Sequence, residues 1–454
     1  MMRFVSAKPP GTMADRRTLL LPVVIGKREL DANLLLGLLA SEAGYRVLIG
    51  LRHSIDNTPR YGEALYLAKN VRQNFVMDRP VAQGHAVVAM DEEGLVRFPA
   101  HVQTVRYQAR SMSLPRLLFA WGDDNADYWR RSPYYRGSPI VLTGNPRADL
   151  LRPELRDFYR SEAEAIRREF GSFVLFNTNF SLVNHFRPRH RSFRKPGLGR
   201  RDFDTVWSGL AAHKRTLMQG FVDLVPNLAR AIAPNRLVIR PHPSENAAVW
   251  REAAASSTNT AVVHRGAVVP WLMATTAVLH NGCTSAVETA LLGRTAYAYR
   301  PVRSAEFDLD LPNAVSSAFD RADDLIVAIN DGLGTCRGKS GRPAREALSR
   351  HVASLTGPLA SERIIAALRD HAGLLEEDRP PPWRSRLVSA GSVVLDAVIS
   401  RTTERRYNAH IFPDLDRSAI TARITKIMQL LGKTYKVRVD LLSNEVFQLQ
   451  VEGA

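Results

Sequence analysis

Residues 18–50, TLLLPVVIGKRELDANLLLGLLASEAGYRVLIG, decide the fold class. They begin with Thr18–Ile25, a continuous apolar run with the length of a strand that is buried on both faces. Glu29–Ala43 then repeats its apolar residues at helical spacing and stops at Gly44, and Tyr45–Gly50 is a second apolar strand. Because both connections are short, this segment predicts a right-handed parallel β–α–β crossover and therefore an α/β domain.

The same alternation continues and predicts two α/β halves. In the first half we expect a helix at Gly62–Asn74 and strands at Ala86–Met90, Leu117–Trp121 and Pro139–Thr143. In the second half we expect strands at Phe173–Phe176, Leu237–Arg240, Thr260–Val263, Ala277–His280 and Thr295–Tyr299. Two consecutive halves of this kind predict two Rossmann-like domains that face each other across a cleft, with ligands beyond the carboxyl ends of the strands.

The predicted division of the chain has four parts. These are a flexible tail (1–16), an N-terminal Rossmann-like domain (17–165), a C-terminal Rossmann-like domain (166–375) and a small α+β extension of unknown role (376–454). The extension begins with the proline-rich connector EEDRPPPW, and we expect a helix at Ile420–Leu431 followed by a hairpin of Tyr435–Leu441 and Val446–Glu452.

Composition narrows the class of protein. The chain has 454 residues, of which 45% are hydrophobic and 24% charged, which excludes a disordered or collagen-like protein. With two cysteines, a disulfide scaffold or thiolate zinc cluster is excluded, and a reducing cytoplasm is expected. No apolar run approaches the ~20 residues of a membrane-spanning helix, and Met1–Lys8 has no apolar segment typical of a secretory signal.

The chain is strongly basic, with a formal net charge of +17. Such a surplus indicates an anionic partner, which can be nucleic acid, an acidic membrane face or a phosphorylated substrate. The alternative is that the arginine content reflects a GC-rich coding genome. Charge alone does not choose between these interpretations.

Two strand exits in the second half carry the residues best suited to hold phosphate. At the first, Arg240-Pro241-His242-Pro243-Ser244-Glu245, two prolines stiffen the backbone around His242, and Ser244 is expected to cap the next helix. At the second, His280-Asn281-Gly282-Cys283-Thr284-Ser285, a tight turn leads into a helix N-terminus with hydroxyl and N–H donors. Glu288, one turn later, can close a capping box or accept from a ribose hydroxyl.

With these motifs, the sequence resembles the bacterial surface carbohydrate (surface polysaccharide) biosynthesis proteins, which are glycosyltransferase-like chains of GT-B architecture. The resemblance covers most of residues 18–300, including VLTGNPRADLL, FVLFNTNF, IRPHPSEN and HNGCTSAVETALLGRTAYAY. The His-Pro pair with a later Ser/Thr pair is also similar to the donor motif of transferases that use CMP-activated sialic acid or Kdo. A similar arrangement occurs in CDP-glycerol phosphotransferases.

The resemblance implies an acceptor domain in the first half and a cytidine-nucleotide donor in the second. The donor-binding residues that it implies, together with the neighbouring polar residues, are Asn177, Thr178, Asn179, Arg240, His242, Pro243, Ser244, His280, Asn281, Gly282, Thr284, Ser285 and Glu288. In this sequence the second pair is Thr284-Ser285, where the similar transferases have two serines.

The catalytic base of an inverting transfer is expected in the first half, where it would take a proton from the acceptor hydroxyl. The candidates are Glu29 and Asp31 after the first strand, His53 after the second, and Asp91, Glu92 and Glu93 after Ala86–Met90. From these we take Glu29, Asp31 and Glu92 as the catalytic candidates. The alternatives are that Glu29 and Asp31 are first-turn helix carboxylates and that Asp91–Glu93 form only a turn.

No metal and no cofactor besides the nucleotide-activated donor is expected, because the sequence has no HExxH motif and no CxxC pair. GxGxxG and Walker A motifs are also absent, which argues against a dinucleotide oxidoreductase or an NTPase. The predicted function is therefore transfer of a sugar, from a CMP-activated acidic donor, to a glycan or lipid-linked acceptor in surface polysaccharide synthesis. The alternatives are a CDP-polyol phosphotransferase and a non-catalytic assembly scaffold.

A basic segment, Phe186–Arg201 (FRPRHRSFRKPGLGRR), is too charged to be a core element. It can be a solvated insertion, or it can contact anionic lipid or a lipid-linked acceptor at the inner face of the cell membrane. RNA binding is the third alternative, and no RNA-binding motif accompanies it, so no nucleic-acid partner is expected.

If the segment contacts anionic lipid, replacing Arg187, Arg189, Arg191 and Arg194 by Glu should reduce binding to vesicles that contain an anionic phospholipid. Added salt should reduce binding of the original protein in the same way, because it screens the attraction. Co-sedimentation with vesicles measures both effects. Unchanged co-sedimentation of the substituted protein would leave the segment as a solvated insertion.

Overall fold

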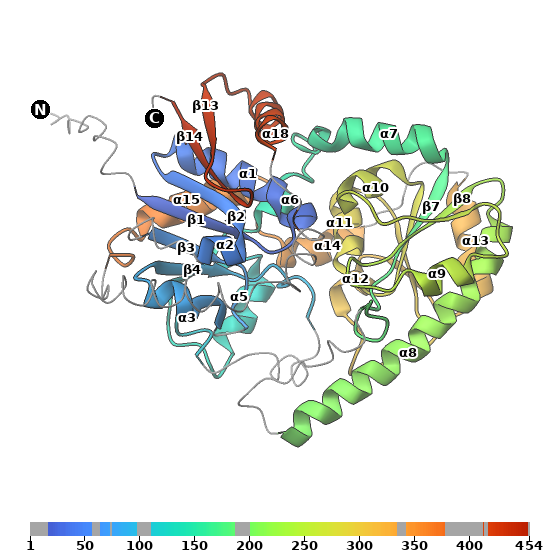
Figure 1. The fold of residues 1–454 in the computed structure, drawn as a ribbon. Coiled ribbons are helices and arrows are strands. Elements are labelled where there is room, and N and C mark those ends of the chain that lie inside the picture. The colour runs from blue at the N-terminus through green and yellow to red at the C-terminus, as the bar shows by residue number, and fades with distance from the viewer. Residues whose placement is uncertain are drawn as a thin grey trace, which may run out of the picture.

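The computed structural model describes residues 17–56, 64–72, 75–97, 110–186, 200–333, 342–376, 412 and 416–452. These residues form two β-sheets, each covered by helices, which lie side by side (Figure 1). The fold class predicted from the sequence is confirmed, because both sheets have the alternating β–α connections of Rossmann-like domains.

The first sheet has eight strands in the order β13-β14-β2-β1-β3-β4-β5-β6. Its strands are β1 (Thr18–Val23), β2 (Arg46–Leu51), β3 (Ala64–Ala68), β4 (Ala86–Met90), β5 (Leu117–Ala120), β6 (Ile140–Leu142), β13 (Val437–Leu441) and β14 (Val446–Val451). Strands β1 to β6 pair in parallel, as buried apolar runs predict. The helical elements in this part of the chain are α1 (Gly26–Glu42), α2 (Arg52–Asp56), α3 (Phe75–Ala82), α5 (Asp123–Arg130), α6 (Pro146–Asp149) and the 3₁₀ helix η3 (Arg156–Tyr159).

The second sheet has six parallel strands in the order β12-β11-β10-β7-β8-β9. They are β7 (Phe173–Asn177), β8 (Arg236–Arg240), β9 (Thr260–Val262), β10 (Ala277–His280), β11 (Ala296–Tyr299) and β12 (Ser317–Phe319). The helices are α7 (Arg160–Phe170), α8 (Arg200–Ala231), α9 (Ala248–Ala253), α10 (Val268–Ala274), α11 (Thr284–Leu291), α12 (Asp310–Ala314) and α13 (Ala322–Leu333). Strand β7 lies at the centre, where Phe173, Val174, Leu175 and Phe176 are almost fully buried.

The helix expected at Gly62–Asn74 is wrong, because Ala64–Ala68 is strand β3. All five residues of this strand are buried, and it pairs in parallel with both β1 and β4. A short apolar run between two central strands satisfies its backbone groups in the sheet, and this outweighs the helical propensity of its Ala and Leu residues.

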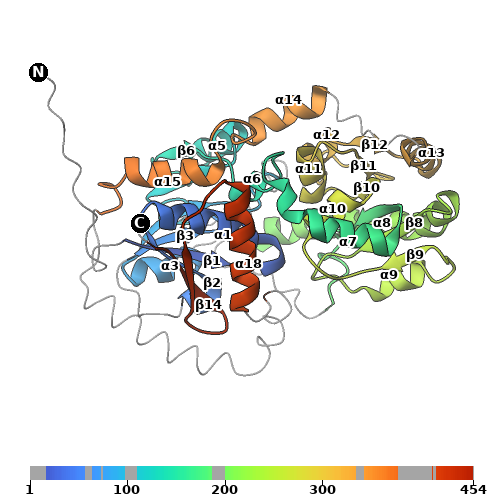
Figure 2. The same cartoon turned by 90° about the horizontal axis from the view of Figure 1, so that it is seen from above.

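After the second sheet the chain returns to the first half. Helix α14 (Arg342–His351) lies between α5 and α12, and α15 (Ala360–Asp370) packs against α1 and α6 (Figure 2). The buried carboxylate of Asp149 accepts hydrogen bonds from the N–H groups of Ala360 (2.7 Å) and Ser361 (2.9 Å) at the start of α15. Residues 360–370 were expected to belong with the second domain, but they lie against helices of the first.

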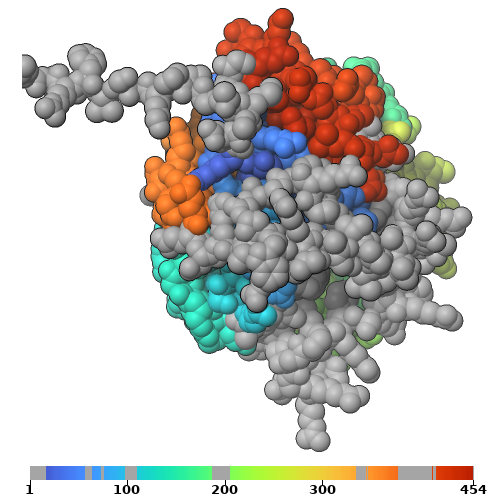
Figure 3. All heavy atoms as spheres, turned by 60° about the vertical axis from the view of Figure 1, so that its left-hand side comes forward, coloured from blue at the N-terminus to red at the C-terminus, as the bar shows by residue number. Residues whose placement is uncertain are grey.

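The C-terminal extension completes the first sheet. The expected hairpin is present as β13 and β14, and β14 pairs antiparallel with β2. Helix α18 (Arg417–Leu430) packs against α1, where Arg423 forms an ion pair with Asp31 (2.6 Å). Figure 3 shows this segment (red) directly against the N-terminal one (blue). No helix in the described parts of the chain is long and apolar enough to cross a membrane.

Because β14 belongs to the core of the first sheet, removing the buried ring of Phe447 should destabilise the protein strongly. Phe447 is 0% exposed, and Phe447→Ala should lower the free energy of unfolding by about 3–5 kcal/mol. The control is Leu442→Ala, because Leu442 is 44% exposed and its loss should change stability by no more than about 0.5 kcal/mol. Urea unfolding measures both variants. An equally small effect of both would mean that the hairpin is not part of the folded core.

Candidate functional site

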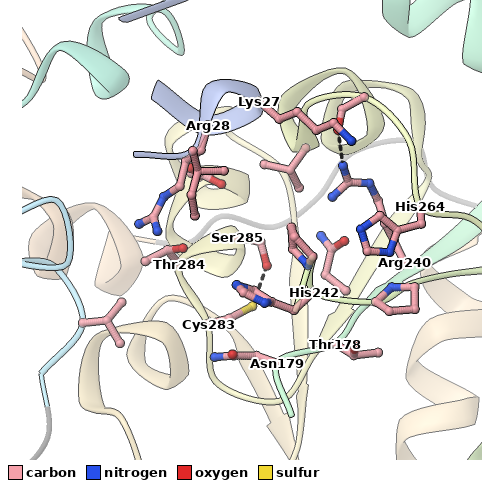
Figure 4. Close-up of a pocket in the computed structure, with 18 of the residues that line it drawn as sticks. Lys27, Arg28, Thr178, Asn179, Arg240, His242, His264, Cys283, Thr284 and Ser285 are labelled. Carbon is pink, nitrogen blue, oxygen red and sulfur yellow. Dashed lines mark hydrogen bonds between the residues drawn. The ribbon is translucent and has the colours of Figure 1, made fainter. Parts of the chain in front are cut away.

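The carboxyl ends of strands from both sheets border one pocket (Figure 4), which encloses about 1020 Å³ of empty space with its open mouth included. The first half contributes Ile25, Lys27 and Arg28 after β1, Glu93 and Val96 after β4, and Arg147 after β6. The second half contributes Asn177–Asn179, Arg240–Pro243, His264, Gly266, Val268, Cys283–Ser285 and Glu288. The pocket is therefore where a doubly wound fold is expected to bind its ligand.

Two cations in the pocket have no carboxylate partner among the described residues. Lys27 comes from the first turn of α1 and points toward Arg240 at the end of β8 (Figure 4). Arg240 donates to the carbonyl oxygens of Gly266 (2.5 Å) and Arg265 (3.3 Å), neither of which is charged. Burial lowers the pKa of Arg240 to about 10, and burial and the charge of Arg240 lower the pKa of Lys27. Both shifts would be relieved by a bound anion.

Two helix N-termini add to this positive potential. Helix α1 begins at Gly26 after Ile25, and α11 begins at Thr284 after Cys283. Ile25 has no side chain that could cap α1, so N–H groups of its first turn remain for a ligand, whereas the Cys283 sulfur lies against the N–H groups of Ser285 and Ala286 at the start of α11. One helix comes from each half, and residues of both first turns line the pocket.

His242 is a neutral hydrogen-bond donor in this pocket. Burial, and then the charge of Arg28, lower its pKa to about 4. Its Nδ1 atom accepts a hydrogen bond from the N–H of Ser244 (3.2 Å), so the ring proton lies on Nε2 and can be donated. The expected helix cap at Ser244 is wrong: α9 begins only at Ala248, and Ser244 does not line the pocket.

Glu245 ends the quoted Arg240–Glu245 motif and was not predicted as a site residue, but its buried carboxylate organises this edge of the pocket. Its Oε1 atom accepts from the Thr178 hydroxyl (2.8 Å), the N–H of Phe180 (2.8 Å) and the N–H of His242 (3.3 Å). Its Oε2 atom accepts from the indole N–H of Trp250 (3.0 Å). One carboxylate thus fixes the loops after β7 and β8 relative to each other.

The predicted residues after β10 divide into two groups. Thr284, Ser285 and Glu288 line the pocket, whereas His280, Asn281 and Gly282 do not. His280 is completely buried, with Nε2 2.9 Å from the Ser316 hydroxyl and Nδ1 accepting from the N–H of Gly282 (3.0 Å). It is therefore placed as a structural histidine that holds the turn, which Gly282 makes with a φ of 81°.

Residues after β7 also reach the pocket, as expected. The side-chain amide nitrogen of Asn177 is buried without a hydrogen-bond partner, so it can donate to a ligand oxygen. Asn179 lines the pocket and donates weakly to the carbonyl of Gly282 (3.5 Å). Thr178 is occupied by Glu245.

The three predicted catalytic carboxylates do not line the pocket. Asp31 faces α18, where it pairs with Arg423 and accepts from the Tyr159 hydroxyl (3.2 Å). Glu29 is buried and accepts from the N–H of Val24 (2.9 Å), which is the helix-terminal role given as its alternative. Glu92 is buried between Lys69 (3.4 Å) and Arg147 (3.5 Å).

Arg147 lines the pocket and joins the two halves. It lies on α6 of the first half, contacts Glu92 and forms an ion pair with Glu288 on α11 of the second half. Glu288 therefore pairs with an arginine and does not close a capping box with Ser285. Lys27, Arg28, Arg147 and His264 were missed from the sequence, although each follows a strand as closely as the residues that were chosen.

Among the described residues, no three His, Cys, Asp or Glu side chains are grouped so that they could hold a metal ion. The four arginines proposed to contact the membrane or the acceptor, Arg187, Arg189, Arg191 and Arg194, lie outside the described residues.

Comparisons with known proteins agree with the fold. No family model matches the chain, and no curated protein matches its sequence. The solved structure of the wall teichoic acid polymerase TagF, in a variant soaked with CDPG, matches with a TM-score of 0.51 and 11% identity, over 80% of this chain and 89% of that one. UDP-GlcNAc 2-epimerase from Neisseria meningitidis, bound to UDP-GlcNAc, matches with a TM-score of 0.48 and 13% identity, over 78% and 100%. The chain has a GT-B-like fold.

Burial of His280 makes the stability of the protein pH-dependent. Burial, and then the charge of Lys214, lower the pKa of His280 to about 3, whereas an unfolded histidine titrates near 6.5. Below about pH 6.5 the unfolded state binds a proton that the folded state does not, so stability falls as pH falls. Between pH 7.5 and 5.0, His280→Asn should lose about 2 kcal/mol less stability than the original protein in urea unfolding. Equal losses would contradict the burial of a neutral ring.

Proposed function

We propose that the protein is a transferase of cell-surface glycan synthesis that binds a nucleotide-activated donor in the pocket between its two halves. The observation that carries the proposal is the pair Lys27 and Arg240, which form no ion pair with a carboxylate within the described residues and line a pocket that the first turns of α1 and α11 also border. A phosphate group supplies the charge and the acceptor oxygens that this arrangement lacks.

The charge of the pocket fits a donor with two negative charges. Its lining contains four Lys or Arg residues and two Glu residues, a surplus of two positive charges with histidines neutral. A CMP-linked acidic sugar carries one charge on its phosphodiester and one on its carboxylate. His242, Arg240 and the N-terminus of α11 would hold the phosphate, while Asn177, Thr284 and Ser285 would donate to the sugar or its carboxylate.

A second donor class has the same charge. A CDP-polyol carries two negative charges on its pyrophosphate, and the architecture shared with the teichoic acid polymerase soaked with CDPG favours this alternative. The protein would then transfer a polyol phosphate instead of a sugar. The acceptor in either case is proposed to be a glycan or lipid-linked molecule, and the protein to work in the cytoplasm at the membrane face, without a metal.

Nucleotide binding tests the proposal directly. In a thermal-shift screen, CMP or CDP should raise the melting temperature more than UDP, GDP or ADP. A nucleotide at about a hundred times its Kd stabilises the folded state by about 2.7 kcal/mol. His242→Ala should weaken binding of the best nucleotide roughly 10- to 100-fold, because one hydrogen bond to a charged phosphate is lost, and His242→Asn should keep part of the affinity.

Each outcome has a distinct meaning. A larger shift with a purine or uridine nucleotide would overturn the cytidine assignment, and no shift with any nucleotide would overturn the donor site. Unchanged affinity in folded His242→Ala would remove this histidine from the site. Labelled CMP-sugar and CDP-glycerol then separate sugar transfer from phosphotransfer by which labelled group reaches the product.

A further inference from the structure

One carboxylate of the first half reaches the pocket from solvent. The side chain of Glu93 is 35% exposed, whereas Glu29 and Glu92 are 4% and 7% exposed as residues. Glu93 alone of these three lines the pocket, so an acceptor hydroxyl that enters there can contact it and cannot contact the other two.

The turn that carries Glu93 is held rigidly. The Asp91 carboxylate accepts from the N–H of Glu93 (3.1 Å), and the Asp91 carbonyl accepts from the indole N–H of Trp121 (2.7 Å) and the N–H of Gly94 (2.8 Å). A Cβ atom at Gly94 would lie 2.8 Å from the Trp121 ring, so the turn needs glycine there. This turn therefore fixes the position of Glu93 at the pocket.

Arg28 holds Glu93 in the pocket. Its Nη1 atom forms an ion pair with the Glu93 carboxylate, and its Nη2 atom donates to the carbonyl oxygen of Glu92 (3.3 Å). Arg28 lies one residue after Lys27 on α1, lines the same pocket, and its charge acts on His242 across the cleft. A phosphate held by Lys27 and His242 would therefore also attract Arg28.

We propose that Glu93 is the catalytic base and that Arg28 is shared between Glu93 and the donor phosphate, so that binding of the donor draws Arg28 away and frees the carboxylate. This inference rests on the proposed function. It replaces Glu29, Asp31 and Glu92, the carboxylates chosen from the sequence, with a residue that can touch the acceptor.

The charge of Arg28 controls how strong a base Glu93 is. Burial alone would raise the pKa of Glu93, but Arg28 outweighs it, with help from Arg72 and Arg147, and the pKa is lowered to about 2. A carboxylate with so low a pKa is a weak base. Losing the contact with Arg28 raises the pKa, so Glu93 becomes a stronger base only when the donor is present.

The proposed transfer step has the same form for both donor classes. The acceptor oxygen forms a bond to the anomeric carbon of a CMP-sugar, or to the β-phosphorus of a CDP-polyol, and the bond from that atom to the leaving phosphate oxygen breaks with its electron pair. CMP leaves in both cases. The proton of the acceptor hydroxyl passes to the Glu93 carboxylate, and Arg28 with Lys27 neutralises the charge that develops on CMP.

The test combines CDP affinity with the rate of CMP release from CMP-sugar or CDP-glycerol. Glu93→Gln should bind CDP about three- to tenfold more tightly, because Arg28 is released from its partner, and should release CMP about 10²- to 10⁴-fold more slowly. Arg28→Gln should bind CDP more weakly. In the double variant the gain from Glu93→Gln should disappear, because it acts through Arg28.

The matched control is Glu154→Gln, which removes an exposed carboxylate that is also paired with an arginine, Arg152. It should change neither readout. If Glu93→Gln does not fold, Glu93→Asp keeps the charge and should release CMP at a rate at least tenfold below the original protein while still binding CDP.

The outcomes separate the two claims. Normal CMP release in folded Glu93→Gln, or in Glu93→Asp where that variant stands in for it, would overturn Glu93 as the base. Weaker CDP binding in Glu93→Gln, or a gain in affinity that survives in the double variant, would overturn the sharing of Arg28. If the original protein binds no nucleotide at all, the proposed function itself fails, and the inference fails with it.

Discussion

The direction of the strands is the constraint on which the site depends. In a parallel sheet all strands end at one edge, and here the edges of both sheets border the same pocket. Residues far apart in the sequence, such as Lys27 and Arg240, meet there because Arg240 ends β8 and Lys27 lies in the first turn of the helix that follows β1. Arg147 keeps the edges together, since it contacts Glu92 on its own side and Glu288 on the other.

Charge is distributed unevenly over this junction. Lys69, Glu92, Arg147 and Glu288 form a chain of buried ion pairs that joins the two halves, and Arg147 and Glu288 of this chain line the pocket. Lys27 and Arg240 also line the pocket, but they form no ion pair within the described chain. Lys and Arg residues therefore have two roles in this region. Those that reach a carboxylate join the two halves, and those that reach none are left to attract a ligand.

Much of the fold follows from apolar runs, but the site follows from them only in part. Buried strands such as β7, β8 and β10 stand out because they are mostly apolar, and the polar residues at and after their ends include Asn177, His242 and Thr284, which line the pocket. After β1, the expectation of a catalytic base favours the acidic residues, so the sequence alone does not single out Lys27 and Arg28.

What the sequence could not reveal depends on distant partners. The residues around Asp31 in the sequence do not indicate that Arg423, 392 residues away, forms an ion pair with its carboxylate. His280 ends a strand just as Arg240 does, yet its ring turns into the core toward Ser316 while Arg240 lines the pocket. Strand β3 was misread for a related reason, since its neighbours in the sheet, and not its own residues, make it a strand.

The pairing of β14 with β2 joins two segments that are synthesised far apart in time. Strand β2 leaves the ribosome early, but the residues that pair with its outer edge, 446–449, follow about four hundred residues later. Until those residues are synthesised, the N–H and C=O groups at the outer edge of β2 are unpaired, and side chains that are buried in the folded protein are exposed to solvent. The outer edge of β2 therefore stays unpaired throughout synthesis of the second half, which is the period in which the growing chain is most open to pairing with another strand.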